Sequence, residues 1–357
     1  MSGGVDSSVA AALLADAGHD VVGATLKLWG GPSDSGCCSV SDVDDARRVA
    51  EQIGVPHHVF NFTEVFEQTV VDPYVASHAL GRTPNPCIEC NRHVKFGRLL
   101  ERAERLGFDA LATGHHARVS GSVGEAGRRL VRGVDAAKDQ SYVLSMLTGR
   151  ELARLALPIG HLTKGEVRDV AGRLGLRTAR KPDSQEVCFI HSTEGRGPFL
   201  AGRIALHPGE VVDRASGAVV GRVPAVELVT VGQRRGLGVG TGGRRRFALS
   251  VDVAARRIEV GDADTARASV VSVEATAWSG PPLEPGERAL VQVTAHGHPA
   301  PGRFRGSRVI FDRPQPLVAA GQTVAFYDVR RPEVVVGSAL ACEGDGGDGR
   351  LATGRVS

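Results

Sequence analysis

The sequence predicts an α/β protein whose first domain is built on a doubly wound parallel sheet, followed by two small all-β domains, the last a β-barrel. In the first part of the chain, apolar runs of strand length alternate with amphipathic helical stretches, the order that produces parallel sheets. Further on, the runs become short and are broken by Gly, Pro and Asp, as in all-β domains. We expect a first domain over 1–203, a central domain over 204–265, a barrel over 266–345 and a disordered tail over 346–357.

Within these domains, helices are expected where apolar residues recur at helical spacing, and strands where short β-branched runs end at turn residues. Ser41 is placed to cap one helix, which ends at Gly54, and Gly107 is placed to end another. The expected helices cover 7–17, 42–54, 63–80, 90–107, 138–147 and 163–175, and the expected strands of the first domain cover 19–28, 57–62, 108–115 and 184–190. The later β runs cover 207–223, 246–262, 289–298, 307–312 and 322–328.

The composition excludes several classes of protein. Apolar residues make up 42% of the 357 residues and charged residues 23%, as in soluble globular proteins, and no apolar run approaches the roughly 20 residues that span a bilayer. The N-terminus lacks the regions of a signal peptide, and six cysteines are too few for a disulfide scaffold, so we expect a cytoplasmic protein without membrane contact. Because the net charge is only +3, nucleic-acid binding would need local basic patches.

Lysine is rare in this chain. Only five of the 43 basic residues are lysines, and a lysine that persists against such a bias marks a position where a planar guanidinium would not substitute for a compact ammonium. Chance remains the simpler explanation for any one of them. All five lie in the expected first domain, at Lys27, Lys95, Lys138, Lys164 and Lys181.

The stretch SGGVDSS at residues 2–8 predicts a phosphate-binding loop. Gly3 and Gly4 allow the backbone to approach a ligand closely, and Ser7 and Ser8 begin a helix whose N–H groups point at that ligand. Asp6 is placed to help hold Mg²⁺. A serine-capped Gly-Gly turn would explain a shorter string, but the full string is more specific than that.

Cys87 and Cys90 form a C-x-x-C pair in the stretch TPNPCIECNRHVKF. Such a pair is half of a zinc site, a redox pair, or a nucleophile with a neighbouring thiol. A structural zinc needs four ligands, and the adjacent Cys37 and Cys38 would give poor chelate geometry. Cys188, in an expected strand, is either a buried core thiol or a partner of this pair.

The loop resembles the PP-loop of the ATP pyrophosphatase superfamily, whose members cleave ATP between the α- and β-phosphates to adenylate a carbonyl oxygen. The order of the remaining motifs is similar to that of the tRNA-specific 2-thiouridylases, the bacterial MnmA family. The motifs that carry this resemblance are GRTPNP, ATGHHAR, KDQSYVLSML, LTKGEVR and DSQEVCFI, then HPGEVVD, VTVGQRRGLG and GQTVAFYD. It implies a first domain of the adenine nucleotide α-hydrolase-like type.

The resemblance implies a reaction in which ATP, with Mg²⁺, adenylates the C2 oxygen of the wobble uridine of tRNA, releasing pyrophosphate, and sulfur then displaces AMP. Cys188 matches the cysteine that carries a persulfide, and Cys90 matches the nucleophile that forms a transient disulfide with it. We expect Cys90 at a helix N-terminus near Arg92, His93 and Lys95, a setting that would lower the pKa of its thiol.

Further positions carry over from the same resemblance. The implied ATP-binding residues are Met1, Ser2, Gly3, Gly4, Val5, Asp6, Ser7, Leu26 and Gly114. The implied contacts to tRNA and its target base are Asn85, Pro86, Cys87, His115, Lys138, Asp139, Gln140, Ala295, His296 and Gln322. From the residues alone, His115 would equally suit a turn, and the Lys138–Gln140 segment a solvated helix start. The implied partners are tRNAs of the Lys, Glu and Gln type and a cysteine desulfurase or sulfur carrier protein, and we expect a monomer.

Two other classes of function are open to the sequence. A synthetase that uses the loop on a small molecule would need neither paired cysteines nor RNA-binding β modules, and a non-catalytic tRNA-binding module would release no AMP. The role of Cys87, where many family members carry Asp, is also open. In the favoured hypothesis, Cys87 takes no part in a persulfide cycle of Cys90 and Cys188. In the other, the three cysteines hold an iron–sulfur cluster with one open iron.

The chain departs from the family pattern in two places. The family has a further strand before the loop, so we expect the native start to lie upstream of Met1, and N-terminal sequencing of the native protein would test this. After VQV the family tends to carry Arg-Tyr-Arg, where this chain has TAHGHPAPGRF. We therefore expect Arg303, Arg305 and Arg308 to compensate for weakened contacts at Ala295 and His296.

Overall fold

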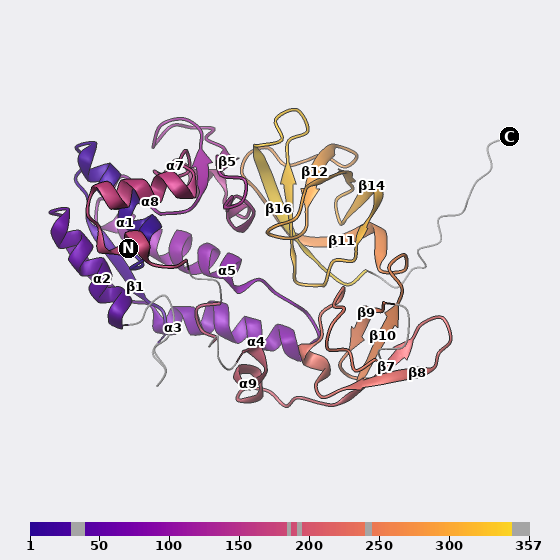
Figure 1. Cartoon of the computed structure of the whole chain (residues 1–357). Coiled ribbons are helices and arrows are strands. Elements are labelled where there is room, and N and C mark those ends of the chain that lie inside the picture. The colour runs from indigo at the N-terminus through magenta and orange to yellow at the C-terminus, as the bar shows by residue number, and fades with distance from the viewer. Residues whose placement is uncertain (30–39, 184–186, 191–194, 240–244, 345–357) are drawn as a thin grey trace.

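The structure is a computed structural model that describes residues 1–29, 40–183, 187–190, 195–239 and 245–344. A helical part with short strands is followed by a small four-stranded sheet and then by a closed barrel (Figure 1). The expected order of an α/β part and then all-β parts ending in a barrel is confirmed. The expected tail over 346–357 lies outside the described residues. Within those residues, no helix is long and apolar enough to cross a membrane.

Helices make up most of the first part. The α-helices are α1 (Val5–Asp16), α2 (Val40–Gln52), α3 (Thr63–Phe66), α4 (Asp72–Ala79), α5 (Pro86–Glu89), α6 (Leu100–Arg105), α7 (Gly149–Ala153), α8 (Lys164–Arg173) and α9 (Arg196–Ala201). The π-helical segments η1 (Glu67–Val71) and η2 (Cys90–Leu99) continue α3 into α4 and α5 into α6, so that two long helices result. Short 3₁₀ turns are η3 (Tyr142–Leu144), η4 (Arg177–Arg180) and η5 (Val226–Leu228).

Parallel strand pairing bears out the α/β character of this part. The strand β1 (Gly23–Lys27) pairs in parallel with β2 (His57–Asn61), and β3 (Leu111–Ala112) with β6 (Leu155–Ala156). An antiparallel ribbon joins β4 (Ala117–Val119) to β5 (Leu130–Arg132). Among the described residues these are three separate two-stranded sheets, and the strands are shorter than the sequence predicts.

The expected helix over 138–147 is wrong, because only the short turn η3 forms there. The Asp139 carboxylate accepts hydrogen bonds from the amides of Gly133 (2.9 Å) and Ser141 (3.1 Å) and from the Ser141 hydroxyl (2.8 Å). The Gln140 amide donates to the His116 carbonyl at 2.9 Å. An aspartate that binds nearby amides offers the backbone an alternative to the helix, so this segment forms a loop.

The expected strand over 184–190 is wrong in its described part. Residues 187–190 form a turn, in which the Ile190 amide donates to the Val187 carbonyl at 3.0 Å. The apolar character that suggested a strand serves tertiary packing, since the Phe189 ring lies 5.1 Å from the Phe199 ring and 5.4 Å from the Tyr74 ring. Residues 184–186 lie outside the described residues, as do Cys37 and Cys38.

The β parts form two separate sheets. The small sheet has the order β8–β7–β10–β9, from β7 (Gly209–Asp213), β8 (Val219–Val223), β9 (Phe247–Asp252) and β10 (Arg257–Gly261). The barrel closes in the order β11–β14–β13–β12–β15–β16, from β11 (Arg267–Trp278), β12 (Arg288–Gln292), β13 (Ala300–Phe304), β14 (Arg308–Pro316), β15 (Thr323–Tyr327) and β16 (Val335–Ala341). Periodicity did not indicate β11, whose two bulges interrupt the alternation of its side chains, nor β13 and β16.

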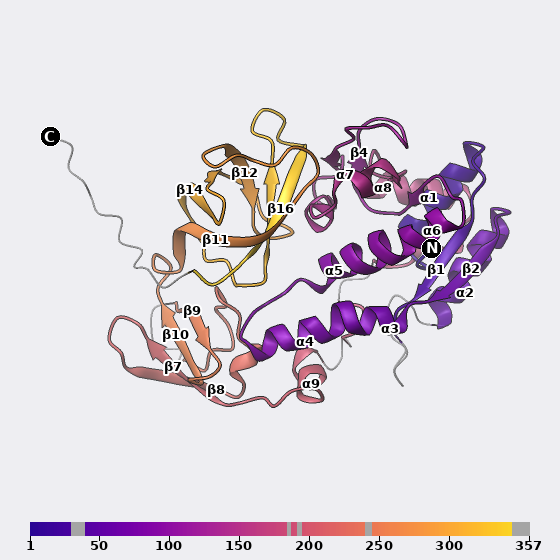
Figure 2. The same ribbon diagram turned by 180° about the vertical axis from the view of Figure 1, so that it is seen from behind.

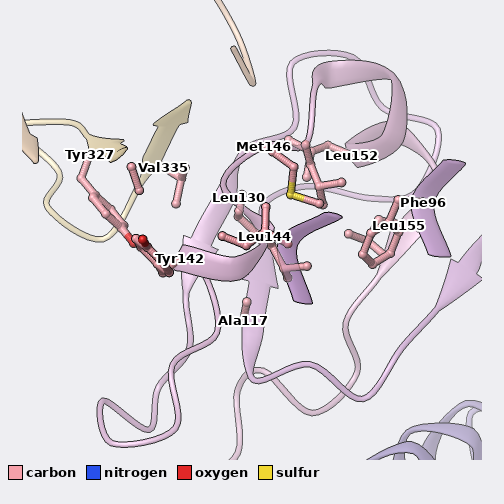
Figure 3. Packing of buried hydrophobic residues seen from close by; sticks show 13 residues of the cluster. Phe96, Ala117, Leu130, Tyr142, Leu144, Met146, Leu152, Leu155, Tyr327 and Val335 are labelled. Carbon is pink, nitrogen blue, oxygen red and sulfur yellow. The ribbon is translucent and has the colours of Figure 1, made fainter. Parts of the chain in front are cut away.

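The barrel packs directly against the first part, and both views place it on the side away from α1 and α2 (Figure 2). Tyr142 and Leu144 share one buried apolar cluster with Tyr327 of β15 and Val335 of β16 (Figure 3). The Tyr142 hydroxyl donates to the Thr323 carbonyl at 2.7 Å. The loop before η3 is therefore fixed against the barrel.

His78, near the end of α4, joins the first part to the small sheet. Its side chain is buried, and its Nδ1 lies 3.2 Å from the carbonyl oxygen of Glu227 in η5. Its Nε2 has no hydrogen-bond partner among the described residues. Burial, reinforced by the charge of Arg196, lowers the pKa of His78 to about 4, although the Glu227 carbonyl opposes this shift.

We predict that His78→Gln makes stability less sensitive to acid. In the unfolded chain this histidine binds a proton near pH 6.5, whereas in the folded protein it binds one only near pH 4. The contribution of neutral His78 is therefore complete above pH 6.5 and is lost as the pH falls towards 4. Glutamine does not titrate, so the slope of the unfolding free energy against pH should fall by up to about 1.4 kcal/mol per pH unit.

Urea unfolding between pH 7 and 4, on the wild type and the variant, measures this slope. His58→Gln, at an exposed position of β2, is the control. Equal slopes for the wild type and His78→Gln would contradict the prediction.

Candidate functional site

The loop of residues 2–8 leads into the N-terminus of α1, which begins at Val5, earlier than expected. Gly3 has a φ of +69°, and a β-carbon there would lie 2.4 Å from the Asp42 carbonyl oxygen of α2, so only glycine fits. Gly4 is the N-cap residue and has no side chain that could cap the helix. An N-terminus with uncapped amides is suited to a phosphate group.

Serine hydroxyls fix the shape of this loop. The Ser2 amide donates to the Ser7 hydroxyl oxygen at 3.0 Å, and the Ser8 hydroxyl donates to the Gly4 carbonyl at 2.8 Å. The Met1 carbonyl accepts a hydrogen bond from the Thr25 hydroxyl of β1 at 2.6 Å. The loop is thus held to the strand that also carries Leu26.

Gly114, which follows β3, packs directly on the loop. A β-carbon at this position would lie 2.6 Å from the Asp6 carbonyl carbon and 2.6 Å from the Ser7 nitrogen. Contacts this short to backbone atoms exclude any side chain. The structure therefore places Gly114 against the loop of residues 2–8. The implied contact of Gly114 with ATP stays a prediction.

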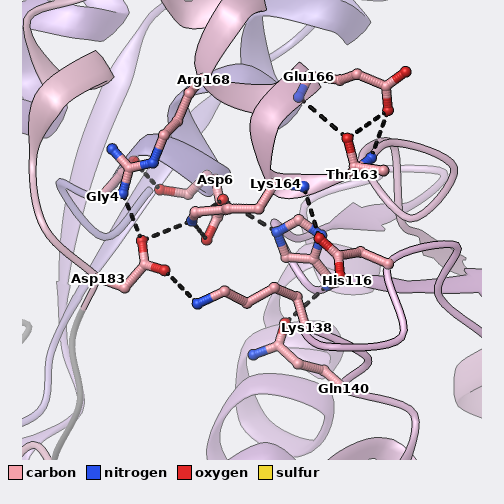
Figure 4. A network of polar contacts seen from close by, with 12 residues as sticks. Gly4, Asp6, His116, Lys138, Gln140, Thr163, Lys164, Glu166, Arg168 and Asp183 are labelled. Carbon is pink, nitrogen blue, oxygen red and sulfur yellow. Dashed lines mark hydrogen bonds and ion pairs between the residues drawn. The ribbon is translucent and has the colours of Figure 1, made fainter.

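Asp6, in the first turn of α1, joins the loop to two other elements (Figure 4). Lys164 Nζ, from α8, lies 2.7 and 2.8 Å from its two carboxylate oxygens, and His116 Nε2 lies 3.3 Å from Oδ1. Burial opposes ionisation of Asp6, but the hydrogen bonds from His116 and Lys164 outweigh it and hold the pKa below its ordinary value. Asp6 is therefore a carboxylate at neutral pH.

Asp183 extends this network (Figure 4). It lies 2.8 Å from the Nζ atoms of both Lys138 and Lys164 and 3.1 Å from Arg168. Burial opposes its ionisation, but hydrogen bonds from Lys138 and Lys164 lower the pKa of Asp183 to about 2. Three permanent cations thus face Asp6 and Asp183, and a third carboxylate, Asp135, accepts the Lys164 amide at 2.9 Å. The cations offer charged hydrogen-bond donors to an anionic ligand.

Sequence reasoning missed Lys164, Asp183 and His116 as parts of this network. The scarcity of lysine was the available signal, since Lys138 and Lys164 lie in the network and Lys181 lies close to the loop. Lys181 Nζ is 2.5 Å from Asp42, the residue whose carbonyl Gly3 approaches. No periodic pattern marks Asp183, which the chain brings to α8 only through tertiary packing.

His115 and Gln140 lie next to His116 and so border the network. Burial, and then the charge of Lys95, lower the pKa of His115 to about 3, so its ring is neutral. That ring packs 6.0 Å from the Phe96 ring of η2, and its Nδ1 lies 2.8 Å from the Thr113 hydroxyl. Gln140 Oε1 accepts the amide hydrogen of His116 at 2.8 Å. The resemblance implies that His115 and Gln140 contact tRNA, and in this structure both side chains form hydrogen bonds within the protein.

The cysteine helix begins at Pro86, so the expectation that Cys90 lies at its N-terminus is wrong. Asn85 caps this helix, and its side chain accepts the Cys87 amide at 3.1 Å. Cys87 is exposed in the first turn, whereas Cys90 is buried one turn later, where η2 begins. The effect of the helix N-terminus therefore falls on Cys87.

Two of the side chains expected to act on Cys90 have another partner. Glu89 lies 3.3 Å from Arg92 and 3.2 Å from His93. The sequence expectation left out this carboxylate, which directly precedes Cys90. A π-helical segment begins at Cys90, and π-helical turns are rare in proteins and frequent at functional sites.

Cys90 and Cys188 belong to one apolar cluster. Cys90 is one of its buried members, and Cys188 and Leu26 pack against it. The turn over 187–190 brings Cys188 there, next to the buried ring of Phe189. Within the described part of the chain, no group of three or more His, Cys, Asp or Glu side chains is arranged to hold a metal ion.

The barrel residues implied to contact tRNA lie at its boundary with the first part. Gln322 Nε2 donates to the Thr83 carbonyl, just before the cysteine helix. Ala295 is half-buried and packs against the cluster of Tyr142, whereas His296 is exposed. The structure brings Gln322 and Ala295 to this boundary, and Asp139 faces it as well through its ion pair with Arg132 (2.7 Å).

This chain is similar to known proteins along nearly its whole length. The family model described as tRNA methyl transferase HUP domain matches residues 1–192, and the one described as tRNA methyl transferase PRC-barrel domain matches residues 197–262. A tRNA-specific 2-thiouridylase of Salinispora arenicola is 45% identical and covers 95% of this chain and 96% of its own length. Relatives of the same name from Thermobifida fusca and Chloroflexus aurantiacus are 43% and 44% identical, and each covers 96% of this chain, with 94% and 97% of their own lengths.

We predict that Gly114→Ala weakens nucleotide binding. The new methyl group would press on the backbone of Asp6 and Ser7 and displace the loop, at a cost of about 1–3 kcal/mol, or roughly tenfold or more in ATP affinity. Calorimetric titration with ATP measures the change. The control is Gly172→Ala in α8, where a β-carbon meets nothing within 4 Å, and its ATP affinity should match the wild type. Unchanged affinity in Gly114→Ala would disprove the close packing.

Proposed function

We propose that this chain, which belongs to the tRNA-specific 2-thiouridylase family, transfers sulfur to C2 of the wobble uridine of tRNA in an ATP-dependent reaction. The observation that carries the proposal is that the N-terminus of α1, which Gly4 leaves without a side-chain cap, lies near the apolar cluster to which Cys90 and Cys188 belong. Phe96, on the helix of Cys90, packs on His115, and the next residue, His116, contacts Asp6.

The phosphate loop and its network are proposed to carry out activation. The C2 oxygen of the uridine attacks the α-phosphorus of ATP, pyrophosphate leaves, and the oxygen becomes part of an AMP leaving group. Lys138, Lys164 and Arg168 supply positive charge where the phosphate oxygens become more negative. The carboxylates of Asp6 and Asp183 offer oxygen ligands of the kind that Mg²⁺ prefers, and the ion would neutralise the charge of the departing pyrophosphate.

The cysteine cluster is proposed to carry out sulfur transfer. The terminal sulfur of a Cys188 persulfide attacks C2, the C2–O bond breaks, and AMP leaves with the oxygen. The Cys90 thiolate then attacks the Cys188 sulfur, releases the 2-thiouridine, and forms a Cys90–Cys188 disulfide. A thiol reductant restores both cysteines, and a cysteine desulfurase or sulfur carrier protein supplies the next persulfide.

The description of the family model names methyl transfer, whereas the relatives are named for thiolation. The loop and the two cysteines support thiolation, because methyl transfer requires neither an adenylated oxygen nor a second thiol. Incubation with ATP, a sulfur donor, a methyl donor and bulk tRNA should yield AMP and 2-thiouridine in the tRNA. A methylated base in place of 2-thiouridine would contradict the proposal. A small-molecule synthetase would leave the tRNA unthiolated, and a binding module would form no AMP.

The persulfide cycle predicts distinct effects for Cys87 and Cys188 under anaerobic conditions. Cys188→Ser should be inactive, since it removes the sulfur carrier. Cys87→Ser should keep substantial activity, because Cys87 lies outside the buried cluster that holds Cys90. Thiolation rates and iron content of the active protein are the measurements.

The iron–sulfur alternative predicts the opposite pattern. Cys87→Ser would then be as inactive as Cys188→Ser, and the wild type would be active only with bound iron. That result would reject the persulfide cycle for this protein.

Exposed arginines of the barrel are proposed to contact tRNA phosphates. Arg303, Arg305 and Arg308 are exposed, and among the described residues none of them forms an ion pair. Changing all three to Ala should weaken tRNA binding and flatten its dependence on salt, because each lost phosphate contact reduces the slope by about 0.7–0.9. Filter binding at several salt concentrations measures both effects.

A matched control removes three arginines of the small sheet. Arg214, Arg222 and Arg257 are exposed but paired with Glu210 or Glu259, so their loss leaves carboxylates behind and should not reproduce the flattened slope. Wild-type affinity at low and high salt in the Arg303, Arg305 and Arg308 variant would refute the barrel contact.

A further inference from the structure

We propose that Arg132 is a positioning residue that makes the geometry of the Lys138–Gln140 loop depend on the docked barrel. Its guanidinium lies between the two parts, where Nη1 donates to Asp139 and Nη2 donates to Gln292 of β12, both at 2.7 Å. It also lies over the Tyr327 ring, with Cζ 3.9 Å from the ring centre. The proposal rests on the proposed function, since it assigns this arginine to the activation of tRNA.

Arg132 is part of a closed circuit of interactions. Asp139 accepts the Ser141 hydroxyl proton at 2.8 Å, and the Ser141 oxygen lies 3.1 Å from the Tyr327 hydroxyl. Because Ser141 gives its single proton to Asp139, Tyr327 must donate to Ser141. Burial raises the pKa of Tyr327 to about 12, which keeps this donor protonated. The Tyr327 ring beneath Arg132 closes the circuit.

The backbone holds the circuit on both sides of the boundary. The Arg132 amide donates to the Glu333 carbonyl at 2.8 Å, and Val131 forms an antiparallel bridge with Val334. The Arg132 carbonyl accepts a hydrogen bond from Arg118 at 2.8 Å. The strand β5 thus pairs with β4 on one edge and is joined on the other, by an isolated bridge, to the residues just before β16.

The loop that this circuit holds reaches Asp6 by two routes. Lys138 connects through Asp183 and Lys164, with contacts of 2.8, 2.8 and 2.7 Å. Gln140 connects through His116, whose amide donates a hydrogen bond to Gln140 at 2.8 Å and whose ring lies 3.3 Å from Asp6. A change in the position of the loop would therefore move the groups that bind the phosphates.

On the barrel side, Gln292 extends the circuit to the turn after β12. Its Nε2 donates to the carbonyls of Thr294 (2.9 Å) and Ala295 (3.2 Å), while its Oε1 accepts from Arg132. RNA pressing on this turn would thus act on the loop through one side chain. A guanidinium is required, because a lysine ammonium does not present a planar fork to Asp139 and Gln292 at once.

Arg132→Lys tests the proposal, with Arg129→Lys as the matched control. Arg129 lies just before β5 and also crosses the boundary, but it donates to the Ser279 carbonyl at 3.1 Å and not to Asp139. We expect Arg132→Lys to lower kcat for tRNA-dependent AMP formation roughly tenfold, with tRNA affinity changed by no more than about threefold. Arg129→Lys should stay within about twofold of the wild type in both. Equal losses of kcat in the two variants, or none in Arg132→Lys, would overturn the proposal.

A second variant isolates the link to the turn. Gln292→Glu keeps an acceptor for Arg132 but places a carboxylate oxygen where Nε2 donates to two carbonyls, so it severs the turn from the circuit. If the circuit relays the effect, the double variant Arg132→Lys, Gln292→Glu should be about as slow as Arg132→Lys alone. Losses that multiply would reject the relay.

A measurement that needs no activity separates this proposal from the proposed function. The amides of Gly133 and Ser141 donate to Asp139, so their hydrogen exchange should quicken about tenfold or more in Arg132→Lys but not in Arg129→Lys. Unchanged exchange refutes the positioning role whatever the enzyme does. Absence of tRNA-dependent AMP in the wild type, with quickened exchange in Arg132→Lys, refutes the proposed function and leaves the positioning role standing.

Discussion

The ion pair between Asp6 and Lys164 is the constraint on which the arrangement of the site depends. It joins the first turn of α1 to the first turn of α8, two elements far apart in the sequence, and His116 adds a third. The pair is largely shielded, since only 12% of the Lys164 side chain is exposed. Loss of Lys164 would leave the Asp6 carboxylate with His116 as its other side-chain partner in a half-buried place, which costs more than an exposed pair is worth.

Around this pair, charge and steric fit act together. Glycines at 3 and 114 let the loop lie against α2 and the end of β3 at distances that no side chain permits. Lys138, Lys164 and Arg168 bring three cationic groups, each paired with a carboxylate, to the place where the phosphates of a nucleotide would bind. The same groups that stabilise the fold at this point are thus the groups proposed to act on ATP.

The barrel takes part in the site without containing it. Its contact with the first part is an apolar cluster around Tyr142 and Tyr327, bordered by the polar circuit of Arg132 and Asp139. A satisfied polar circuit of this kind specifies one docking geometry, which apolar contact by itself does less well. The loop over 138–141 is irregular because Asp139 and Gln140 bind partners outside it, so its shape is a property of the whole assembly.

The α/β part, the later β parts and the loop at residues 2–8 were predictable from the sequence, because local patterns of apolar residues, glycines and turn residues encode them. The pairing of Cys90 with Cys188 came only from the resemblance to a known family. The sequence did not predict the cap at Asn85, and it placed Cys90 at a helix N-terminus that lies one turn earlier. Only the tertiary structure shows that 138–147 is a loop and 187–190 a turn. Asp139 binds Arg132 and the Gly133 amide, and the Phe189 ring packs on Tyr74, so neither segment forms the regular element that its sequence predicts. It alone brought Asp183 to Lys164 and Arg132 to Gln292, because electrostatic contacts between residues distant in sequence leave no periodic trace in it.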